Sequence, residues 1–152
     1  MKIRKFRIED AEDVSKVIRD SISTGDLTDE AVKTLKRRAN PRTLIRTSGT
    51  TDYYVYEDNG DILGIGGRFK NEVRTMYVSP RFQRKGIGSK ILMEIVNSGR
   101  TKGYRLLFLY THPTAEKFYL NNGFVSIRKF KDGEMNVVYM EKEIKWPQQV
   151  PA

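Results

Sequence analysis

The stretch 72–92, EVRTMYVSPRFQRKGIGSKIL, contains the patterns that decide the fold. Residues 72–78 have the pattern of a β-strand, and apolar residues recur at helical spacing from Ile87 onward. Between them, the loop 83–88 (QRKGIG) combines two glycines, two fixed positive charges and the amino end of a helix. Backbone N–H groups beside glycine, together with the helix dipole, favour a pyrophosphate group at such a position. The loop is therefore predicted to bind phosphates.

Other phosphate-binding loops fit this sequence less well. The chain has no Gly-x-x-x-x-Gly-Lys-Ser/Thr sequence, and Ile91 stands where the dinucleotide-binding pattern requires its third glycine. A second glycine-rich segment, 64–67 (GIGG), is followed by a predicted strand rather than a helix. We therefore interpret 64–67 as a β-bulge or a place of close backbone approach.

The composition narrows the class of protein. With 152 residues, 38% of them hydrophobic, the chain can bury one core, and we expect a single domain over 1–144 and an irregular tail at 145–152. The net charge of +9 favours anionic partners such as nucleic acid, phosphate-rich cofactors or acidic surfaces. The absence of cysteine excludes disulfides, zinc–thiolate sites and a cysteine nucleophile. Without a signal peptide or a long apolar run, the protein is predicted to be cytoplasmic and to have no membrane partner.

The first third of the chain is predicted to be mostly helical. Residues 2–8 alternate as a strand, and 9–22 carry apolar residues on one helical face. A second helix is predicted to start after Thr28, with acidic residues in its first turn, and to end at Asn40-Pro41. Residues 42–51 have a poor helical pattern and are predicted to form a loop.

The middle of the chain is predicted to form three antiparallel strands. Asn59-Gly60 lies between two apolar strand patterns at 53–57 and 62–69, which is a strong signal for a β-hairpin. A short polar turn then leads to the strand 72–78. These three strands should form a meander.

The last part of the chain is predicted to form two helices and the remaining strands of the sheet. The helix that begins at Ile87 should stop at Gly99, and the apolar run 104–110 should be a strand covered on both faces and parallel to 72–78. The connection between parallel strands is expected to be right-handed. A short helix and a second hairpin should follow at 114–120, 124–130 and 135–144.

These elements resemble, in their order, the GNAT superfamily of acetyl-CoA-dependent N-acetyltransferases. The loop matches the family pattern Gln/Arg-x-x-Gly-x-Gly/Ala through Gln83, Gly86 and Gly88. The segment 115–124 (AEKFYLNNGF) is similar to a late helix in which a tyrosine precedes Gly-Phe, and 139–143 (YMEKE) is similar to a common closing strand. The resemblance implies an α/β (α+β) fold with a mixed, mostly antiparallel sheet of about six or seven strands, strands four and five parallel, and about four flanking helices.

The resemblance implies acetyl-CoA (coenzyme A) as the cofactor. Its pyrophosphate would lie on the loop, and its thioester would lie at the end of strand four, where relatives have a distortion that frees a backbone N–H. His112 departs from the pattern, because many relatives have an asparagine there and Pro113 removes a backbone donor, so His112 either contacts the cofactor or is structural. The predicted cofactor-binding residues are Met76, Tyr77, Val78, Gln83, Arg84, Lys85, Gly86, Ile87, Gly88, Ser89, His112 and Phe118.

Acetyl transfer to an amine needs an unprotonated amine, a stabilised oxyanion and a proton for the departing thiolate. The resemblance implies that Tyr119 is the general acid, and the ordinary pKa of a tyrosine, near ~10, suits this role. Glu72 matches a position where some relatives have the general base, but it can equally be interpreted as a solvated carboxylate at a strand end. His112 or a water chain is the alternative base. No metal is expected.

The leading hypothesis is therefore an N-acetyltransferase that moves an acetyl group from acetyl-CoA to a primary amine of a small molecule or peptide by direct attack on the thioester. The alternative is a non-catalytic module that senses acyl-CoA or contacts nucleic acid. Nucleic acid is disfavoured because the basic residues gather at the predicted phosphate loop and no RNA-reading pattern is found. The acceptor site is predicted between the loop 21–27 and the last hairpin, and a homodimer is compatible with the resemblance. The acceptor amine and the acyl length stay open.

Overall fold

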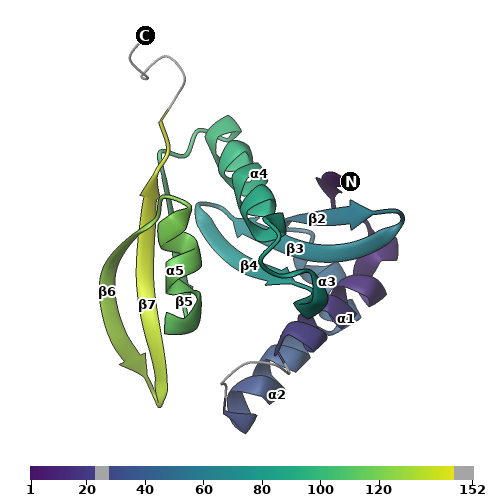
Figure 1. Cartoon of the computed structure of the whole chain (residues 1–152), viewed down its shortest axis with the longest axis horizontal. Helices are drawn as coiled ribbons and strands as arrows, with labels where there is room; N and C mark the ends of the chain where they lie inside the picture. Colours follow the sequence, from purple (N-terminus) through teal and green to yellow (C-terminus); the bar gives the residue numbers. More distant parts are fainter. Residues whose placement is uncertain (23–27, 146–152) are drawn as a thin grey trace.

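A mixed β-sheet forms the centre of the computed structural model, which describes residues 1–22 and 28–145 (Figure 1). Within these residues the sheet has seven strands in the order β1-β2-β3-β4-β5-β7-β6. Neighbouring strands are antiparallel except for β4 and β5, which are parallel as predicted. The predicted tail lies outside the described residues from position 146 onward. The strands are β1 (Lys2–Lys5), β2 (Asp52–Asp58), β3 (Asp61–Phe69), β4 (Glu72–Val78), β5 (Leu106–Thr111), β6 (Val125–Asp132) and β7 (Met135–Glu143).

Helices cover both faces of the sheet (Figure 1). Helix α4 packs across β2–β4 on one face, and α1 packs on the other, with α2 and α3 beside it. Helix α5 packs on β6 and β7, on the same core as α4. Within 1–22 and 28–145, none of the helices has the length and apolar character needed to cross a bilayer. The bounds are α1 (Ala11–Ile22), α2 (Asp29–Arg38), α3 (Pro41–Thr47), α4 (Ile87–Thr101) and α5 (Pro113–Asn121), with 3₁₀ turns at Ile8–Asp10 and Pro80–Phe82.

The loop prediction for 42–51 is wrong, because α3 occupies Pro41–Thr47. Asn40 caps this helix, and its side-chain oxygen accepts a hydrogen bond of 2.9 Å from the Arg42 N–H. Proline at the first helical position has no N–H to lose there, and its fixed φ suits a helix start. The Asn-Pro pair therefore ends α2 and also begins α3.

Two further predictions after the glycine loop are wrong. Helix α4 does not stop at Gly99 but continues to Thr101, and Gly103, with a φ of 92°, follows its end. Gly99 has a packing role instead, since a Cβ built on it would lie 3.2 Å from Leu107. Strand β5 is not covered on both faces: Leu107 and Leu109 are buried, but Tyr110 is 50% exposed because its face lines an open cavity.

The glycines of β3 let α4 approach the sheet closely. A Cβ built on Gly66 would lie 2.5 Å from the Ile91 side chain and 2.7 Å from that of Ile95, both on α4. Gly64 has a similar contact with Ile91 at 2.8 Å. The register of β3 with β4 also shifts at Gly67. The interpretation of the GIGG segment as a place of close backbone approach is therefore confirmed, whereas the extra residue of this register shift is Arg74 in β4 and not a residue of the segment.

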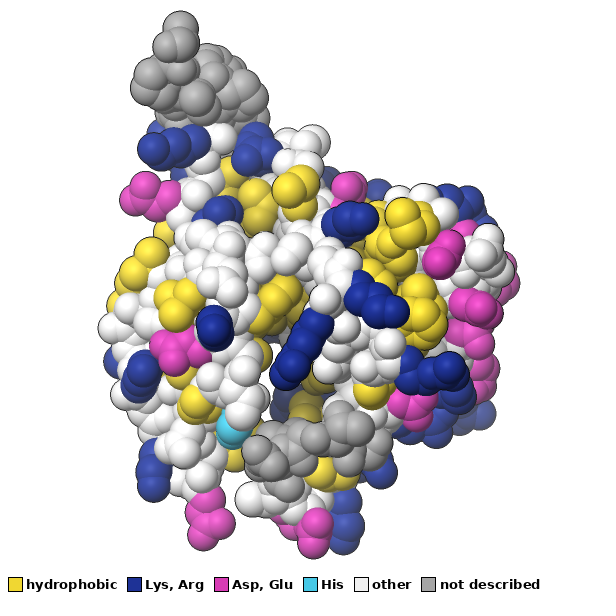
Figure 2. All heavy atoms as spheres, in the orientation of Figure 1, with side chains coloured by type: hydrophobic (Ala, Val, Ile, Leu, Met, Phe, Trp, Pro, Cys, Tyr) yellow, Lys and Arg dark blue, Asp and Glu magenta, His cyan; other side chains and the backbone are white. Residues whose placement is uncertain are grey.

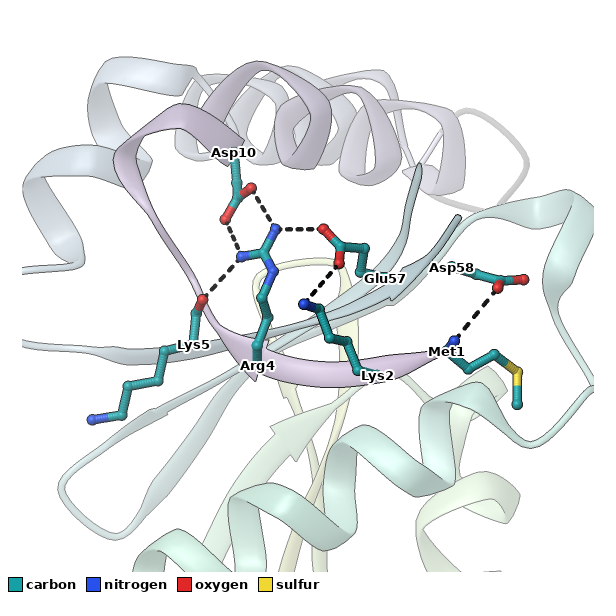
Figure 3. Close-up of polar contacts among 7 residues, drawn as sticks. All are labelled: Met1, Lys2, Arg4, Lys5, Asp10, Glu57 and Asp58. Carbon is teal, nitrogen blue, oxygen red and sulfur yellow. Dashed lines mark hydrogen bonds and ion pairs between the residues drawn. The ribbon is translucent and has the colours of Figure 1, made fainter. Parts of the chain in front are cut away.

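A partly buried ion-pair cluster joins β1 to the start of α1 and to β2 (Figure 3). The Arg4 guanidinium donates to both Asp10 carboxylate oxygens, at 2.8 and 2.9 Å, and to Glu57 Oε1 at 3.0 Å. The Arg7 N–H also donates to Asp10, at 2.7 Å. Burial, the largest single influence, raises the pKa of the Asp10 carboxyl, but the hydrogen bonds and charge of its arginine partners outweigh burial and lower that pKa. The cluster therefore holds Asp10 in its charged form.

Candidate active site

The loop between β4 and α4 contains two residues with positive φ and ends at the amino end of α4. Arg84 and Gly86 both have positive φ, at 62° and 84°. Gly86 is the residue that precedes α4, and a Cβ built on it would meet nothing within 4 Å, so backbone conformation rather than space favours glycine there. The first turn of an α-helix directs N–H groups without intrahelical acceptors out of its amino end. Residues 87–89 supply such groups here.

A cavity of about 560 Å³ extends from this loop along β4 to α5. In Figure 2 the surface is hollowed between these parts of the molecule, with Lys and Arg side chains along the hollow. Phe118 packs against the start of α4, where a Cβ built on Gly88 would lie 3.1 Å from its ring. The cavity brings together most of the predicted site residues, namely Met76, Val78, Gln83, Arg84, Gly86, Ile87, Gly88, Ser89, Phe118 and Tyr119.

Strand β4 separates from β5 beside this cavity. Among the described residues, the register of the two strands comprises one pair, Glu72 with Phe108. On the other side of β4, the Ser79 N–H donates to Leu63 O at 2.8 Å. Because N–H groups alternate in direction along an antiparallel strand, those of Met76 and Val78 point away from β3 and toward the separation. Their backbone therefore faces the space between β4 and β5.

The distortion expected at 76–78 lies earlier in β4. The register shift opposes Gly67 to Thr75 and Arg68 to Val73, so Arg74 is the extra residue. Residues 76–78 continue the ladder to β3 in regular register. In this structure the strand separation, rather than a bulge, directs the Met76 and Val78 N–H groups into open space.

Tyr119 lies on α5 and lines the cavity, and the residue is only 7% exposed. Its ring packs edge-on against Phe118 and Phe124, with ring centroids 5.0 and 5.7 Å away. Burial, with a smaller contribution from the Tyr77 hydroxyl, raises the pKa of Tyr119 well above its ordinary value. The hydroxyl therefore stays protonated across the physiological pH range and can serve as a hydrogen-bond and proton donor.

Comparison with known proteins identifies the family. The model of the acetyltransferase (GNAT) domain matches residues 23–144. The chain belongs to the GNAT family. No curated protein matches the sequence significantly.

Solved structures with the GNAT fold superpose over nearly the whole chain. The PaiA N-acetyltransferase of Thermoplasma acidophilum, in complex with coenzyme A, has 24% identity and a TM-score of 0.79 over 93% of this chain and 98% of its own. A GCN5-related N-acetyltransferase of Rhodopseudomonas palustris has 16% identity and a TM-score of 0.83 over 93% and 94%. A ribosomal-protein-alanine N-acetyltransferase of Brucella melitensis has 17% identity and a TM-score of 0.74 over 94% and 99%. At these identities the likeness concerns the fold.

Four predicted site residues of this GNAT domain lie outside the cavity. The Lys85 ammonium lies over the Phe82 ring, 5.5 Å from its centroid. Glu72 and Tyr77 line a second cavity, of about 670 Å³, on the face of the sheet that carries α1–α3. Glu72 stands at the opposite end of β4 from Val78, roughly 20 Å away by the rise of an extended strand. The Arg74 Nε donates to Glu72 Oε1 at 2.9 Å.

His112, the fourth of these residues, lines a third cavity, of about 750 Å³, between α2 and the β6–β7 hairpin. Its Nδ1 accepts a hydrogen bond from the Thr114 N–H at 3.3 Å and caps α5. The Thr114 hydroxyl also lies 3.0 Å from Nδ1. Both contacts of His112 are therefore made with Thr114 in the first turn of α5, and His112 itself does not line the cavity at the loop.

Sequence reasoning missed Phe82, Thr114 and Ala115, which also line the cavity at the loop. Phe82 belongs to the stretch that decides the fold, and its neighbour Gln83 donates from its side chain to Val78 O at 3.0 Å. This bond fastens the loop to the end of β4. Thr114 and Ala115 stand one turn before Phe118 on α5, so helical spacing from Phe118 was the available signal.

Proposed function

We propose that this protein is an N-acetyltransferase that moves an acetyl group from acetyl-CoA to a primary amine. One observation carries the proposal: a single cavity connects the open amino end of α4 to the separation between β4 and β5 and to the buried hydroxyl-bearing side chain of Tyr119. A GNAT relative of similar fold is known in complex with coenzyme A, which supports the same cofactor here.

The residues of the loop suit the phosphates of the cofactor. The N–H groups at 87–89 point out of the helix, Arg84 supplies a positive charge, and Gly86 leaves open space at the helix entrance. Arg81 and Lys85 are exposed beside the loop and add positive charge to its surroundings. Acetyl-CoA would supply the activated thioester, with its acyl end toward Met76, Val78 and Tyr119.

Each chemical demand of acetyl transfer then has a candidate group. The N–H groups of Met76 and Val78 stabilise the oxyanion, because they point into the strand separation without a β5 partner in register. Tyr119 donates a proton to the departing thiolate. Glu72 is the candidate that accepts the proton of the ammonium, and it would do so through a chain of several waters, because it lies on the acceptor face of β4 but roughly 20 Å from Val78.

The proposal is tested by measuring release of the coenzyme A thiol with a panel of primary amines. We expect acetyl-CoA turnover that depends on both the amine and the enzyme. Tight acetyl-CoA binding without turnover on any amine would contradict the proposal and favour an acyl-CoA sensor. Salt-sensitive binding of nucleic acid without turnover would instead favour the nucleic-acid module.

Glu72→Gln is expected to lower kcat/KM by about 10²-fold at neutral pH, because the amide cannot accept a proton. Steady-state kinetics with acetyl-CoA and the preferred amine measure the loss. Glu143→Gln is the matched control, since Glu143 is also a carboxylate at the end of a strand but lines none of the three cavities. A Glu72→Gln variant that retains the wild-type kcat/KM would reassign the base.

A further inference from the structure

We infer that the acceptor is an amine that carries a carboxylate close to the reacting nitrogen and an apolar or cationic group on its other side. This inference rests on the proposed function and specifies its second substrate. It is derived from the charges along one groove on the face of the sheet opposite α4. The groove consists of the cavities of about 670 and 750 Å³ described above.

The two cavities meet at a common point. Leu35, Arg38 and Tyr110 line both of them. The smaller of the two cavities is lined by Tyr77 of β4 as well as by Tyr110 of β5. The meeting point therefore lies where the separation of β4 and β5 gives access to the other face. An acceptor amine would approach the thioester here, with the rest of the molecule extending into one or both cavities.

The cavity between α2 and the last hairpin is apolar with acidic side chains. Its floor contains Tyr110 and Phe130, whose rings pack edge-on with centroids 6.3 Å apart. Glu30, Asp132 and Glu134 also line this cavity. Aromatic rings and carboxylates together suit an apolar or cationic group. This cavity also lies where the acceptor site was predicted, although residues 23–27 of the predicted loop are outside the described part of the chain.

The cavity beside β4 has the opposite charge. Arg38, Arg46 and Arg74 line it together with one carboxylate, Glu72, which is paired with Arg74. Among the described residues, no carboxylate lies within salt-bridge distance of Arg38 or Arg46. Guanidinium groups bind carboxylates with two parallel hydrogen bonds, so this cavity suits a carboxylate of the acceptor.

Arg38 lies at the meeting point of the two cavities, where the acceptor amine would react. A fixed positive charge at the meeting point repels an acceptor that is only cationic, because like charges a few ångströms apart are unfavourable. A carboxylate near the ammonium offsets this repulsion. An α-amino acid has the required arrangement, with its carboxylate and its side chain on the carbon that bears the amine. A peptide with an acidic residue next to its amino terminus offers the same chemistry.

The test compares amines that differ only in the carboxylate. We expect kcat/KM for phenylalanine to exceed that for phenethylamine and for phenylalaninamide by about tenfold or more, and lysine to exceed 1,5-diaminopentane similarly. The dipeptides Ala-Asp and Ala-Asn, each with an amidated carboxyl terminus, separate a peptide source from a free amino acid. Calorimetric titration of phenylalanine and phenethylamine into the full chain gives the same comparison without turnover.

Two arginine variants test whether the preference for a carboxylate-bearing amine comes from the groove. Arg46→Met should lower kcat/KM for the preferred carboxylate-bearing amine about tenfold and change that for its carboxylate-free partner less than twofold. Arg42→Met is the matched control, because Arg42 is exposed on the same helix and lines neither cavity. Turnover that is equal with and without the carboxylate, or equal losses for both substrates in Arg46→Met, would overturn the inference and leave the proposed function intact. Absence of turnover on every amine would contradict the proposed function itself.

Discussion

Tyr119→Phe is expected to lower kcat by about 10² to 10⁴-fold and to leave the affinity for coenzyme A within about threefold. The substitution removes only the hydroxyl that would protonate the departing thiolate. The ring keeps its edge-on contacts with Phe118 and Phe124, which hold it at the end of the cavity. Steady-state kinetics with acetyl-CoA, together with calorimetric titration of coenzyme A, separates the chemical step from binding.

The raised pKa of Tyr119 predicts a second result, in the pH dependence of the rate. Burial raises that pKa, so the wild-type enzyme should show no alkaline loss of rate from this residue up to about pH 9. Tyr56→Phe is the matched control: Tyr56 is also a buried tyrosine, but its hydroxyl contacts the Met1 sulfur and lines none of the three cavities of the site. A Tyr119→Phe variant that retains the wild-type kcat would remove the general-acid assignment.

Asp10→Asn is expected to lower the free energy of unfolding by about 3 kcal/mol. The substitution keeps the shape of the side chain but leaves the Arg4 guanidinium, whose side chain is 13% exposed, with Glu57 as its remaining carboxylate partner. Removing one member of a buried ion pair typically costs about 3–5 kcal/mol, and the contact with Glu57 places this case at the lower end. Urea denaturation at pH 7 measures the loss.

The loss should depend on pH in a defined direction. The pKa of the Asp10 carboxyl is lowered by folding, so its contribution to stability is complete above the unfolded value, about 3.9, and is lost as pH falls through the folded value. The difference between wild type and Asp10→Asn should therefore be constant from about pH 6 to 8 and should shrink below about pH 4.

Two further variants test the cause of this loss. The double variant Arg4→Met/Asp10→Asn should be more stable than the sum of its single substitutions predicts, because it removes both charges. Lys16→Met, which breaks an exposed pair with Asp20 of 3.7 Å, should cost less than about 0.5 kcal/mol. A loss for Asp10→Asn as small as that for Lys16→Met would mean that the cluster contributes little to stability.

Much of the fold could be predicted because local patterns and long-range packing agree. Alternation and Asn59-Gly60 identified the β2–β3 hairpin, where both turn residues have positive φ. The errors arose where one residue type has two uses. The Asn40-Pro41 pair ends one helix and begins the next, and Gly99 does not stop α4 but allows it to pack on Leu107. Sequence alone does not distinguish these uses, because they depend on the neighbouring element.

The candidate site was predictable near the loop and less so away from it. Residues 83–89 are close in sequence and stay close in the fold, so a local pattern describes them. Tyr77 lines the other face because side chains alternate along β4, and Glu72 lines that same face, despite its odd spacing from Tyr77, because the extra residue Arg74 shifts the alternation. The charges of the acceptor groove come from α2, α3, β4 and the last hairpin, and their meeting depends on tertiary packing that no local pattern contains.

The separation of β4 from β5 also sets a limit on how stable this fold can become. Continuing the ladder between the two strands would add backbone hydrogen bonds, each contributing about 1 kcal/mol to the free energy of unfolding. The same bonds would occupy the Met76 and Val78 N–H groups and close the passage between the two faces of the sheet. Substitutions selected only for a higher melting temperature are therefore expected to accumulate elsewhere in the molecule. Substitutions that draw β4 and β5 together should raise the free energy of unfolding but leave no space for the proposed substrates.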